Sequence, residues 1–470
     1  MTSAVRQSFD PAYLFFRHLV IPAYEGLAHR RRTFSIWKDL EKTQWLSSQE
    51  VARLQFDAVK RLIAHASSTS RYFQEEWQRL GLTPDALRTP EDFARFPLTT
   101  KDQMREHRAT MRSTRPAGRV MTKRTGGSTG TFLEFDYDDQ SLERRMATWH
   151  RGYSWAGGGP GTRQFYFWGV ASGRSRQQRA KDWLYEHIYR RTFVDTLNYR
   201  DDDVDLYLDQ LTRCAPDVII AYTNPLFALA RALDARGKTP PSPRAIIVGA
   251  EQLHRTQRTL IERVFGAPVF DTYGAREFML MGAECEQHDG FHLSAEHLML
   301  EIVDDDGVPV EAGREGHIVV TDLYNYALPF IRYMTGDRGV AATDPCQCGR
   351  GLPRLASVTG RTLDLVVTPD GRHLPGEYFV RLLGLDPRIR QFQVVQSARN
   401  MLIVRLVLDP AKRQAELADI RTELDQLAGA EMRVAVEILD AIPLTAAGKL
   451  LVVVNQWQRD AVASRRAGDY

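Results

Sequence analysis

The spacing of hydrophobic residues divides the chain into three stretches, and the first of them is mostly helical. Within residues 1–110, a run that starts near Ser48 places Val51, Leu54 and Leu62 on one helical face. From about residue 120 to 360, short apolar runs alternate with helical stretches; the runs are 217–222, 244–250 and 267–274, and the helices between them are 226–235 and 256–264. Strands that alternate with helices predict a parallel or mixed sheet covered by helices.

The pattern changes after about residue 290, where strands separated by turns replace the alternation. The strand-like runs are 299–303, 317–321, 365–368 and 401–408, and a helix at 411–427 and a strand at 433–439 follow the last of them. Asp-Gly at 306–307 and 370–371 predicts hairpin turns, since this dipeptide accepts the positive φ of a tight turn. We therefore predict an α/β protein with two domains: a large one, 1–361, of mixed sheets covered by helices with a small β-rich subdomain, and a small α+β domain, 362–470.

Composition limits the location and the partners of the protein. The 470 residues carry a net charge of +3, a weak field that argues against nucleic acid as the main partner. Four cysteines in so long a chain favour a reducing compartment over a disulfide framework. The start has no signal core, and the apolar stretch 13–27 is too short to span a bilayer, which takes ~20 apolar residues. We expect a cytoplasmic protein without a membrane partner; a homodimer is compatible with the sequence.

The strongest single motif is a loop of small residues, Thr125-Gly126-Gly127-Ser128-Thr129-Gly130-Thr131. Small residues let the backbone approach an anion closely, and successive N–H groups can surround a phosphate. Lys123 and Arg124 add positive charge just before the loop. The loop lacks the Gly-Lys-Ser/Thr ending of a Walker motif. By itself it is compatible both with a phosphate site and with an ordinary loop.

Four further segments follow this loop in a characteristic order. They are Asp271-Thr272-Tyr273-Gly274-Ala275-Arg276-Glu277, Arg332-Tyr333-Met334-Thr335-Gly336-Asp337, Gly360-Arg361-Thr362-Leu363-Asp364 and Pro443-Leu444-Thr445-Ala446-Ala447-Gly448-Lys449. Each is too short to identify a function alone. Together with the loop, the series spans roughly residues 45–455 and resembles the adenylate-forming superfamily of acyl-CoA ligases. Within it, the chain is most similar to the branch of phenylacetate–CoA ligases and capsule-biosynthesis adenylating proteins.

This resemblance implies an enzyme that joins a carboxylate to the α-phosphorus of ATP and releases pyrophosphate. It implies ATP and Mg²⁺ as cofactors, an acyl-AMP intermediate, and a mobile C-terminal domain that rotates between the half-reactions. The expected acceptor is the thiol of coenzyme A; an amine, an alcohol or a carrier-protein thiol is the alternative. A non-catalytic, nucleotide-binding zinc protein is an alternative of another class. Aromatic residues near 167–170 and 222–225 favour an apolar or aryl acid.

The resemblance also implies roles for single residues. The loop 125–131 would hold the β- and γ-phosphates, and Glu277 would bind Mg²⁺, a hard cation that prefers oxygen ligands. Lys449 would bridge carboxylate and phosphate oxygens during adenylation. Further along the chain, the expected nucleotide-binding residues are Gly249, Ala250, Glu251, Asp271, Thr272, Tyr273, Gly274, Asp337 and Arg361.

Three of these residues have specific expected contacts with the nucleoside. Tyr273 would lie against the adenine, and Asp271 would accept the adenine amino group. Asp337 would accept the two ribose hydroxyls, which suits a carboxylate because it is a double acceptor. Gly249-Ala250-Glu251 resembles the end of a second strand that contacts adenine in this superfamily.

The sequence departs from the superfamily at two positions. Arg276 stands where Thr or Ser usually precedes the magnesium glutamate; as a permanent cation it could reach the α-phosphate. Leu363 occupies the usual position of the hinge aspartate, and Asp364 follows one residue later. The sequence therefore leaves open which residue acts as the hinge between the two domains.

A second constellation consists of cysteines and histidines. Cys285 and His288 form one pair, and Cys346 and Cys348 form another. Three thiols and one imidazole are a common ligand set for structural zinc, which prefers four tetrahedral N/S ligands. His292 is the alternative histidine, and free or buried thiols are the alternative to a metal.

Overall fold

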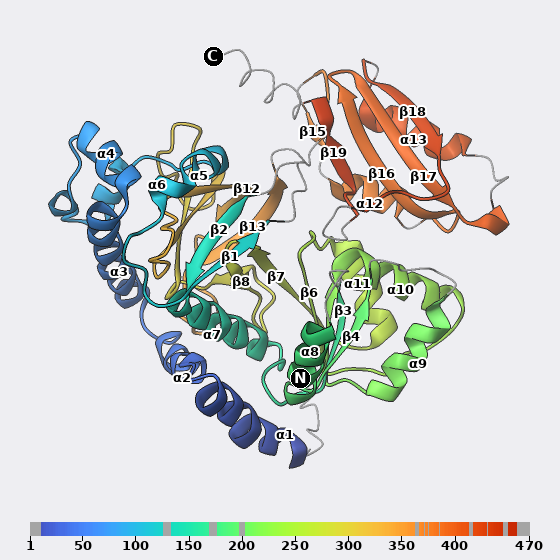
Figure 1. Cartoon of the computed structure of the whole chain (residues 1–470). Helices are drawn as coiled ribbons and strands as arrows, with labels where there is room; N and C mark the ends of the chain where they lie inside the picture. Colours follow the sequence, from blue (N-terminus) through green and yellow to red (C-terminus); the bar gives the residue numbers. More distant parts are fainter. Residues whose placement is uncertain are drawn as a thin grey trace. The chain divides into compact units, whose positions relative to one another are not determined.

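The computed structural model describes residues 11–125, 133–168, 176–196, 203–361, 366–370, 372–374, 376–384, 386–412, 417–429, 431–444 and 450–457. The chain divides into two compact units (Figure 1). The first unit contains most of residues 1–359. The second contains Gly360–Tyr470 together with the short segments Gly126–Thr131 and His254–Leu260.

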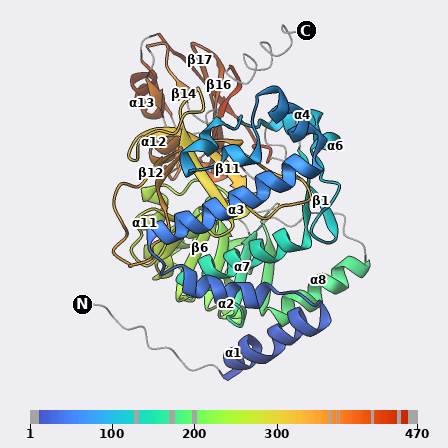
Figure 2. The ribbon, with the colours of Figure 1, turned by 90° about the vertical axis from the view of Figure 1, so that its left-hand side faces the viewer.

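The N-terminal part of the first unit is mostly helical. Figure 2 shows its longest helix, α3, on one side of this unit. The longest helix, α3, starts with a capping box in which Ser47 and Glu50 satisfy each other's backbone N–H groups. Its buried face includes Val51, Leu62 and Ile63. The α-helices of this part are α1 (Pro11–Phe15), α2 (Thr33–Thr43), α3 (Ser48–Thr69), α4 (Arg71–Arg79), α5 (Lys101–Glu106) and α6 (Arg108–Met111).

Eleven strands within the described residues form the main sheet of this unit, in the order β10-β11-β12-β13-β9-β8-β7-β6-β5-β3-β4. Five neighbours are parallel: β3 (Gln164–Trp168), β4 (Arg191–Asp195), β5 (Val218–Tyr222), β6 (Ala245–Gly249) and β7 (Val269–Ala275). The others are β8 (Met279–Ala283), β9 (Phe291–Leu293), β10 (Leu298–Val303), β11 (Glu315–Asp322), β12 (Tyr333–Ala341) and β13 (Arg354–Arg361). β8 runs antiparallel to β7, and β11 to β10 and β12. The predicted α/β class with a mixed sheet is confirmed.

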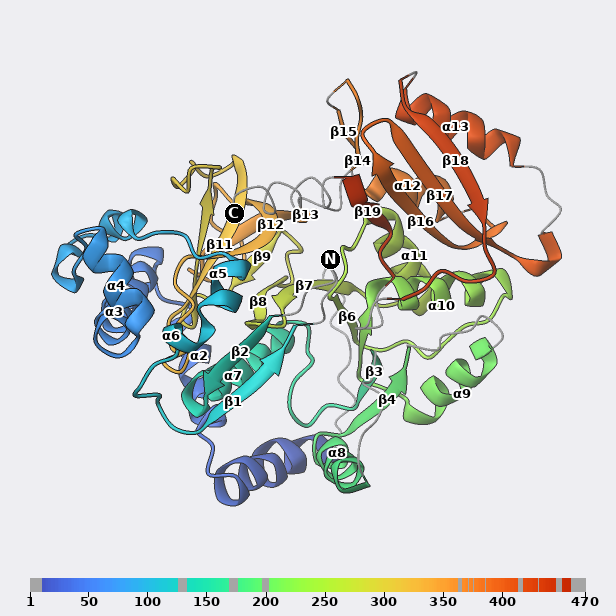
Figure 3. The ribbon, with the colours of Figure 1, turned by 45° about the horizontal axis from the view of Figure 1, so that its top comes forward.

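Further helices connect and flank the parallel strands (Figures 1 and 3). They are α7 (Asp139–Trp155), α8 (Arg176–Ile188), α9 (Val204–Cys214), α10 (Thr223–Ala235) and α11 (Arg255–Phe265). A separate hairpin, β1 (Val120–Arg124) and β2 (Glu134–Asp138), lies beside α7. This hairpin supports the start of the predicted phosphate loop.

The second unit has an α+β structure. Its four-stranded sheet has the order β18-β17-β16-β19, formed by β16 (Ile389–Ala398), β17 (Met401–Leu408), β18 (Arg433–Ile438) and β19 (Val453–Asn455). The helices α12 (Gly376–Leu383) and α13 (Ala418–Ala428) and the hairpin β14 (Val366–Val367) and β15 (His373–Leu374) complete it. Its apolar core includes Phe379, Val404 and Leu424. Among the described residues of the whole chain, no helix has both the length and the apolar character needed to cross a membrane.

Candidate nucleotide site and cysteine cluster

Four parallel strands end at one edge of the main sheet, where open α/β sheets place their ligands. Trp168 and Tyr222 end β3 and β5, and their rings lie 4.1 Å apart between centroids. At the end of β6, Gly249 is required by close packing, because a Cβ there would lie 2.4 Å from Thr272 Oγ1. That hydroxyl donates to the carbonyl of Val248 at 2.7 Å, which locks the ends of β6 and β7 together.

Tyr273 and Asp337, from two motifs that are 64 residues apart, are in direct contact. The Tyr273 hydroxyl donates to Asp337 Oδ2 at 2.8 Å, although β7 and β12 are not neighbours in the sheet. Asp337 lies within β12, directly after Gly336 with φ 83°, and the Asp337 N–H donates to Thr335 Oγ1 at 3.1 Å. The structure thus brings the expected adenine-stacking and ribose-binding residues together.

Arg276 and Glu277 lie in a tight turn between β7 and β8. The turn depends on Gly274, because a Cβ at this position would lie 2.3 Å from the carbonyl oxygen of Met279. The Arg276 side chain is exposed and Glu277 is half-buried. The turn therefore presents a cation and a carboxylate side by side, directly after Tyr273.

Two residues of other elements hold Glu277 in place. Tyr333 donates its hydroxyl to Glu277 Oε1 at 3.4 Å, and the guanidinium of Arg145 on α7 donates to the backbone carbonyl of Glu277. Arg145 is itself buried and paired with Asp322 at 2.7 Å. Sequence reasoning did not single out Arg145, since no motif contains it, whereas Tyr333 stands inside the segment 332–337.

Positive charge gathers around the ring of Tyr137 on β2. Lys123 Nζ lies 4.9 Å from the ring centroid and the Arg145 guanidinium carbon lies 5.1 Å from it. Burial, together with Arg145 and Arg276, lowers the pKa of Lys123 to about 8. Lys123, Arg145 and Arg276 therefore share one electrostatic environment next to Glu277.

Asp271 and Glu251, the carboxylates expected near the adenine, accept hydrogen bonds from backbone N–H groups. Asp271 Oδ1 accepts the N–H of Thr272 at 2.8 Å, and Glu251 Oε2 accepts the N–H of Asn224 at 2.7 Å. Ala250 between the strand end and Glu251 has φ 67°. These contacts order the loop ends around the edge of the sheet.

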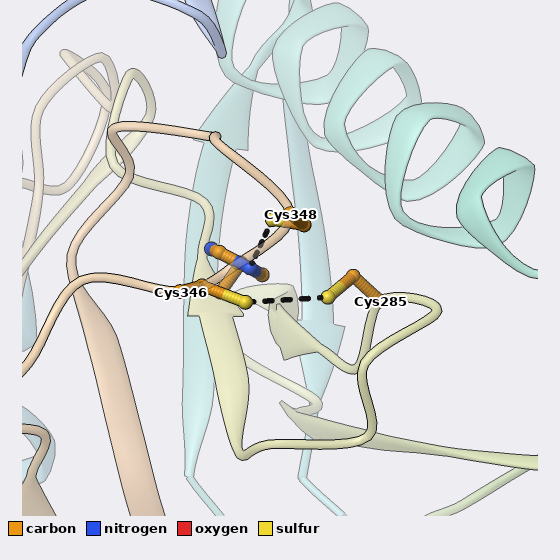
Figure 4. A group of neighbouring side chains, drawn as sticks. Cys285, Cys346 and Cys348 are labelled. Atoms are coloured by element: carbon orange, nitrogen blue, oxygen red, sulfur yellow. Dashed lines mark hydrogen bonds between the residues drawn. The ribbon is translucent and has the colours of Figure 1, made fainter.

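Cys285, Cys346 and Cys348 point toward one another (Figure 4), and His292 completes the group. One ligand atom from each of the four residues lies within 4.8 Å of the others. The sulfurs of Cys285 and Cys346 are 3.7 Å apart, and Cys348 Sγ lies 3.2 Å from His292 Nε2. Two sulfurs bound about 2.3 Å from one tetrahedral Zn²⁺ would be about 3.8 Å apart, so the donor set fits this ion.

The histidine of the group is His292, and the expected ligand His288 lies outside it. His288 Nδ1 lies 3.1 Å from Glu284 Oε2, its ring packs on Phe270 at 4.5 Å between centroids, and its φ is 51°. His292 is instead placed by β9, where it pairs with Arg354 of β13. The Cys-x-x-His spacing suggested the wrong histidine because the turn after Cys285 directs His288 toward Glu284.

The thiols of this group have different environments. Burial raises the pKa of the Cys285 thiol to about 12. Burial would also raise the pKa of Cys348, but hydrogen bonds from the backbone and side chain of Arg350 bring it below its usual value. The Arg350 guanidinium lies about equally far from two indole rings, 5.0 Å from Trp45 and 4.9 Å from Trp155. The loop that carries two of the cysteines is thereby attached to the N-terminal helices.

Comparison with known proteins shows which proteins this chain resembles. Residues 366–456 match the family model of the CapK C-terminal domain. The phenylacetate–coenzyme A ligase of Thermus thermophilus is 26% identical over 383 residues, which cover 80% of this chain and 83% of the relative. The corresponding ligase of Escherichia coli K12 is 27% identical over 378 residues (77% and 83%). Protein CapK of Staphylococcus aureus is 22% identical over 461 residues, which cover 95% of this chain and 98% of CapK.

The chain is a relative of the phenylacetate–CoA ligases and CapK. Its fold agrees with this relationship. A solved structure of 2-hydroxyisobutyryl-CoA ligase with 2-HIB-AMP matches with a TM-score of 0.70 at 19% identity, covering 90% of this chain and 94% of the ligase. The anthranilate CoA ligase AuaEII with anthranoyl-AMP matches with a TM-score of 0.50 at 16% identity, covering 73% and 66%. The predicted resemblance to the phenylacetate–CoA ligases and CapK and the predicted enzyme class, an adenylate-forming ligase, are confirmed.

Several of the expected nucleotide-site residues lie outside the described residues. They are Gly126–Thr131 of the loop, Leu363 and Asp364 at the hinge, and Lys449. At the start of the loop, Thr125 is described: its N–H donates to the Leu133 carbonyl at 2.9 Å, and its hydroxyl accepts the Leu133 N–H at 2.8 Å. Arg361 ends β13.

Proposed function

We propose that the protein activates a carboxylic acid with ATP as an acyl-AMP and transfers the acyl group to the thiol of coenzyme A. The observation that carries this proposal is the contact of Tyr273 with Asp337 beside the turn of Arg276 and Glu277. It groups an aromatic ring, the expected ribose acceptor Asp337, the expected magnesium ligand Glu277 and the cation Arg276 within one unit. The names of the two phenylacetate–coenzyme A ligases given above state the same class of reaction for those proteins.

In the first half-reaction, a carboxylate oxygen of the acid attacks the α-phosphorus and the bond to the pyrophosphate oxygen breaks. Negative charge builds on the phosphate oxygens, so positioning and electrostatics supply most of the catalysis. Glu277 would hold Mg²⁺, which neutralises phosphate charge when it is bound. Arg276 would stabilise the α-phosphate, and Asp337 would fix the ribose.

In the second half-reaction, the coenzyme A thiolate attacks the acyl carbonyl and AMP leaves with the electrons of the broken bond. We propose that Lys449 serves the first half-reaction only, as the resemblance of its motif implies. For the acid itself we propose an apolar or aryl group, since Trp168 and Tyr222 offer aromatic surface at the edge of the sheet.

The test is carboxylate-dependent ATP–pyrophosphate exchange with Mg²⁺ and a panel of aryl and aliphatic acids. Exchange with one class of acid is the expected result, and acyl-CoA should form when coenzyme A is added as the only acceptor. Adenylation without acyl-CoA would transfer the proposal to an amine, alcohol or carrier-protein acceptor. Absence of exchange by a folded protein that binds ATP would contradict the proposal.

Lys449→Ala should lower this exchange about 10²- to 10³-fold, as the loss of one transition-state donor does. Lys412→Ala is a matched control, because Lys412 is an exposed lysine of the same unit that no motif contains. A Lys449→Ala variant with wild-type exchange would remove this residue from the mechanism.

A further inference from the structure

The two faces of the β1–β2 hairpin carry different electrostatics. In this antiparallel pair, Arg124 is opposite Glu134 and Thr122 is opposite Asp136, so these four residues share one face. That face is fully paired: Arg124 Nε lies 2.5 Å from Glu134 Oε1, and Thr122 Oγ1 donates to Asp136 Oδ1 at 2.5 Å. Arg124 therefore already has its counter-ion.

Lys123 belongs to the opposite face and has no such partner. It is opposite Phe135, and its Nζ lies over the neighbouring ring of Tyr137 at 4.9 Å. Among the described residues, no hydrogen bond or ion pair joins Lys123 to a carboxylate, and the same holds for Arg276. The third cation, Arg145, forms an ion pair with Asp322.

Lys123 is half-buried, and the charge of the exposed Arg276 acts on it. Like charges at short range disfavour each other's charged form, and burial adds to that penalty. Both effects act on Lys123, whose pKa falls to about 8 through burial, Arg145 and Arg276. An anion between Lys123 and Arg276 would remove the penalty.

We propose that Lys123 Nζ is a direct ligand of the β- and γ-phosphates of ATP, and that Arg124, its neighbour in sequence, is not. This assignment rests on the proposed function and specifies which of the two cations before the loop binds the nucleotide. Lys123 stands two residues before Thr125, where the predicted phosphate loop begins. Arg276 stands directly before the expected magnesium ligand Glu277.

Nucleotide binding should then be linked to protonation of Lys123. The groups that face it are Tyr137 on β2, Arg145 on α7 and Arg276 after β7. With its pKa lowered to about 8, a substantial fraction of the Lys123 side chains is neutral at pH 8, and bound phosphate would bring this fraction back to the charged form. ATP binding at pH 8 should therefore take up a fraction of a proton per chain.

The experiment compares the full-length wild type with Lys123→Met, Lys123→Arg and the matched control Arg124→Met. Binding of ATP and of AMP is measured by calorimetry at pH 8 in two buffers of different ionisation enthalpy, which gives proton uptake. Lys123→Met should weaken ATP binding about 10- to 100-fold, as loss of a charged hydrogen bond does, and abolish the proton uptake. AMP binding should stay unchanged, because AMP has no β- or γ-phosphate. Lys123→Arg should restore most of the ATP affinity, and Arg124→Met should behave like the wild type.

Equal ATP binding by Lys123→Met and the wild type would overturn the assignment, as would an equal loss of AMP and ATP binding or the same loss in Arg124→Met. The proposed function would stand in these cases if the wild type still exchanges pyrophosphate. A folded wild type that binds no ATP would overturn the proposed function and this assignment together. Thermal unfolding of each variant shows whether a loss comes from misfolding.

Discussion

The cysteine cluster and the group of residues around Tyr273 and Asp337 differ in burial and in how completely their polar groups are paired. The four ligand atoms of Cys285, His292, Cys346 and Cys348 lie within 4.8 Å of one another, and three of these residues are buried. They offer one ion a complete coordination sphere. In the group around Tyr273 and Asp337, by contrast, the charged residues Asp337, Glu277 and Lys123 are half-buried and Arg276 is exposed. Lys123 and Arg276 have no carboxylate partner among the described residues.

This difference fits a structural metal site in the first case and the proposed nucleotide site in the second. A structural metal site is closed, whereas a catalytic one keeps a position open for water or substrate. The cysteine cluster also joins distant segments, since Arg350 next to Cys348 reaches Trp45 and Trp155. We infer that zinc bound there would stabilise the protein without taking part in the reaction.

The largest expected effect tests the cysteine cluster. Cys346→Ser and His292→Ala should lose bound zinc and lower the free energy of unfolding by more than about 4 kcal/mol, because loss of a structural metal belongs to the most destabilising changes. Zinc content by mass spectrometry and thermal unfolding give both quantities.

His288→Ala is the matched control for these variants. His288 is the other histidine of the same segment, and its contact is with Glu284. Its zinc content should equal that of the wild type. If zinc removal instead abolished pyrophosphate exchange and left the unfolding temperature unchanged, the metal would be catalytic and the contrast between the two clusters would be wrong.

A smaller effect is expected at the nucleotide site. Asp337→Asn removes a charged double acceptor, and the KM for ATP should rise about 10- to 100-fold, as loss of a charged hydrogen bond does. The unfolding temperature should change little, because Asp337 is only half-buried. With 2′-deoxyATP as substrate the penalty should be smaller, since one of the two hydroxyls is missing. An equal penalty for both nucleotides would contradict the ribose contact.

The sequence predicted the parts of this protein that local patterns determine. The strands at 217–222, 244–250 and 267–274 are short apolar runs that each follow a helix, and they form β5, β6 and β7. The family could be recognised because the order of its motifs along the chain does not depend on how the chain folds. The contact between Tyr273 and Asp337 fits the proposed shared ligand, since the sheet order does not make their strands neighbours.

The sequence did not predict the features that depend on tertiary direction. Two histidines lie within seven residues of Cys285, and only the register of β9 on β13 selects His292 over His288. Arg145 belongs to no motif, and its contact with the Glu277 carbonyl arises from the packing of α7. Lys123 and Arg124 are equivalent cations in the sequence; the pairing of β1 with β2 places them on opposite faces.

The smallest expected effect concerns the single hydrogen bond between Tyr273 and Asp337. Tyr273→Phe keeps the ring and removes only the hydroxyl that donates to Asp337 at 2.8 Å. Because this hydroxyl only positions Asp337, and the carboxylate remains in the variant, we expect a loss of about 0.5–1.5 kcal/mol and a rise of the KM for ATP of only about 2- to 10-fold. Since the hydroxyl acts through the carboxylate, Tyr273→Phe should add nothing once Asp337→Asn is present, a coupling that a double-mutant cycle measures. Additive effects would mean that the tyrosine and the aspartate contact the nucleotide independently, and the hydrogen bond would then have no role in positioning the ribose acceptor.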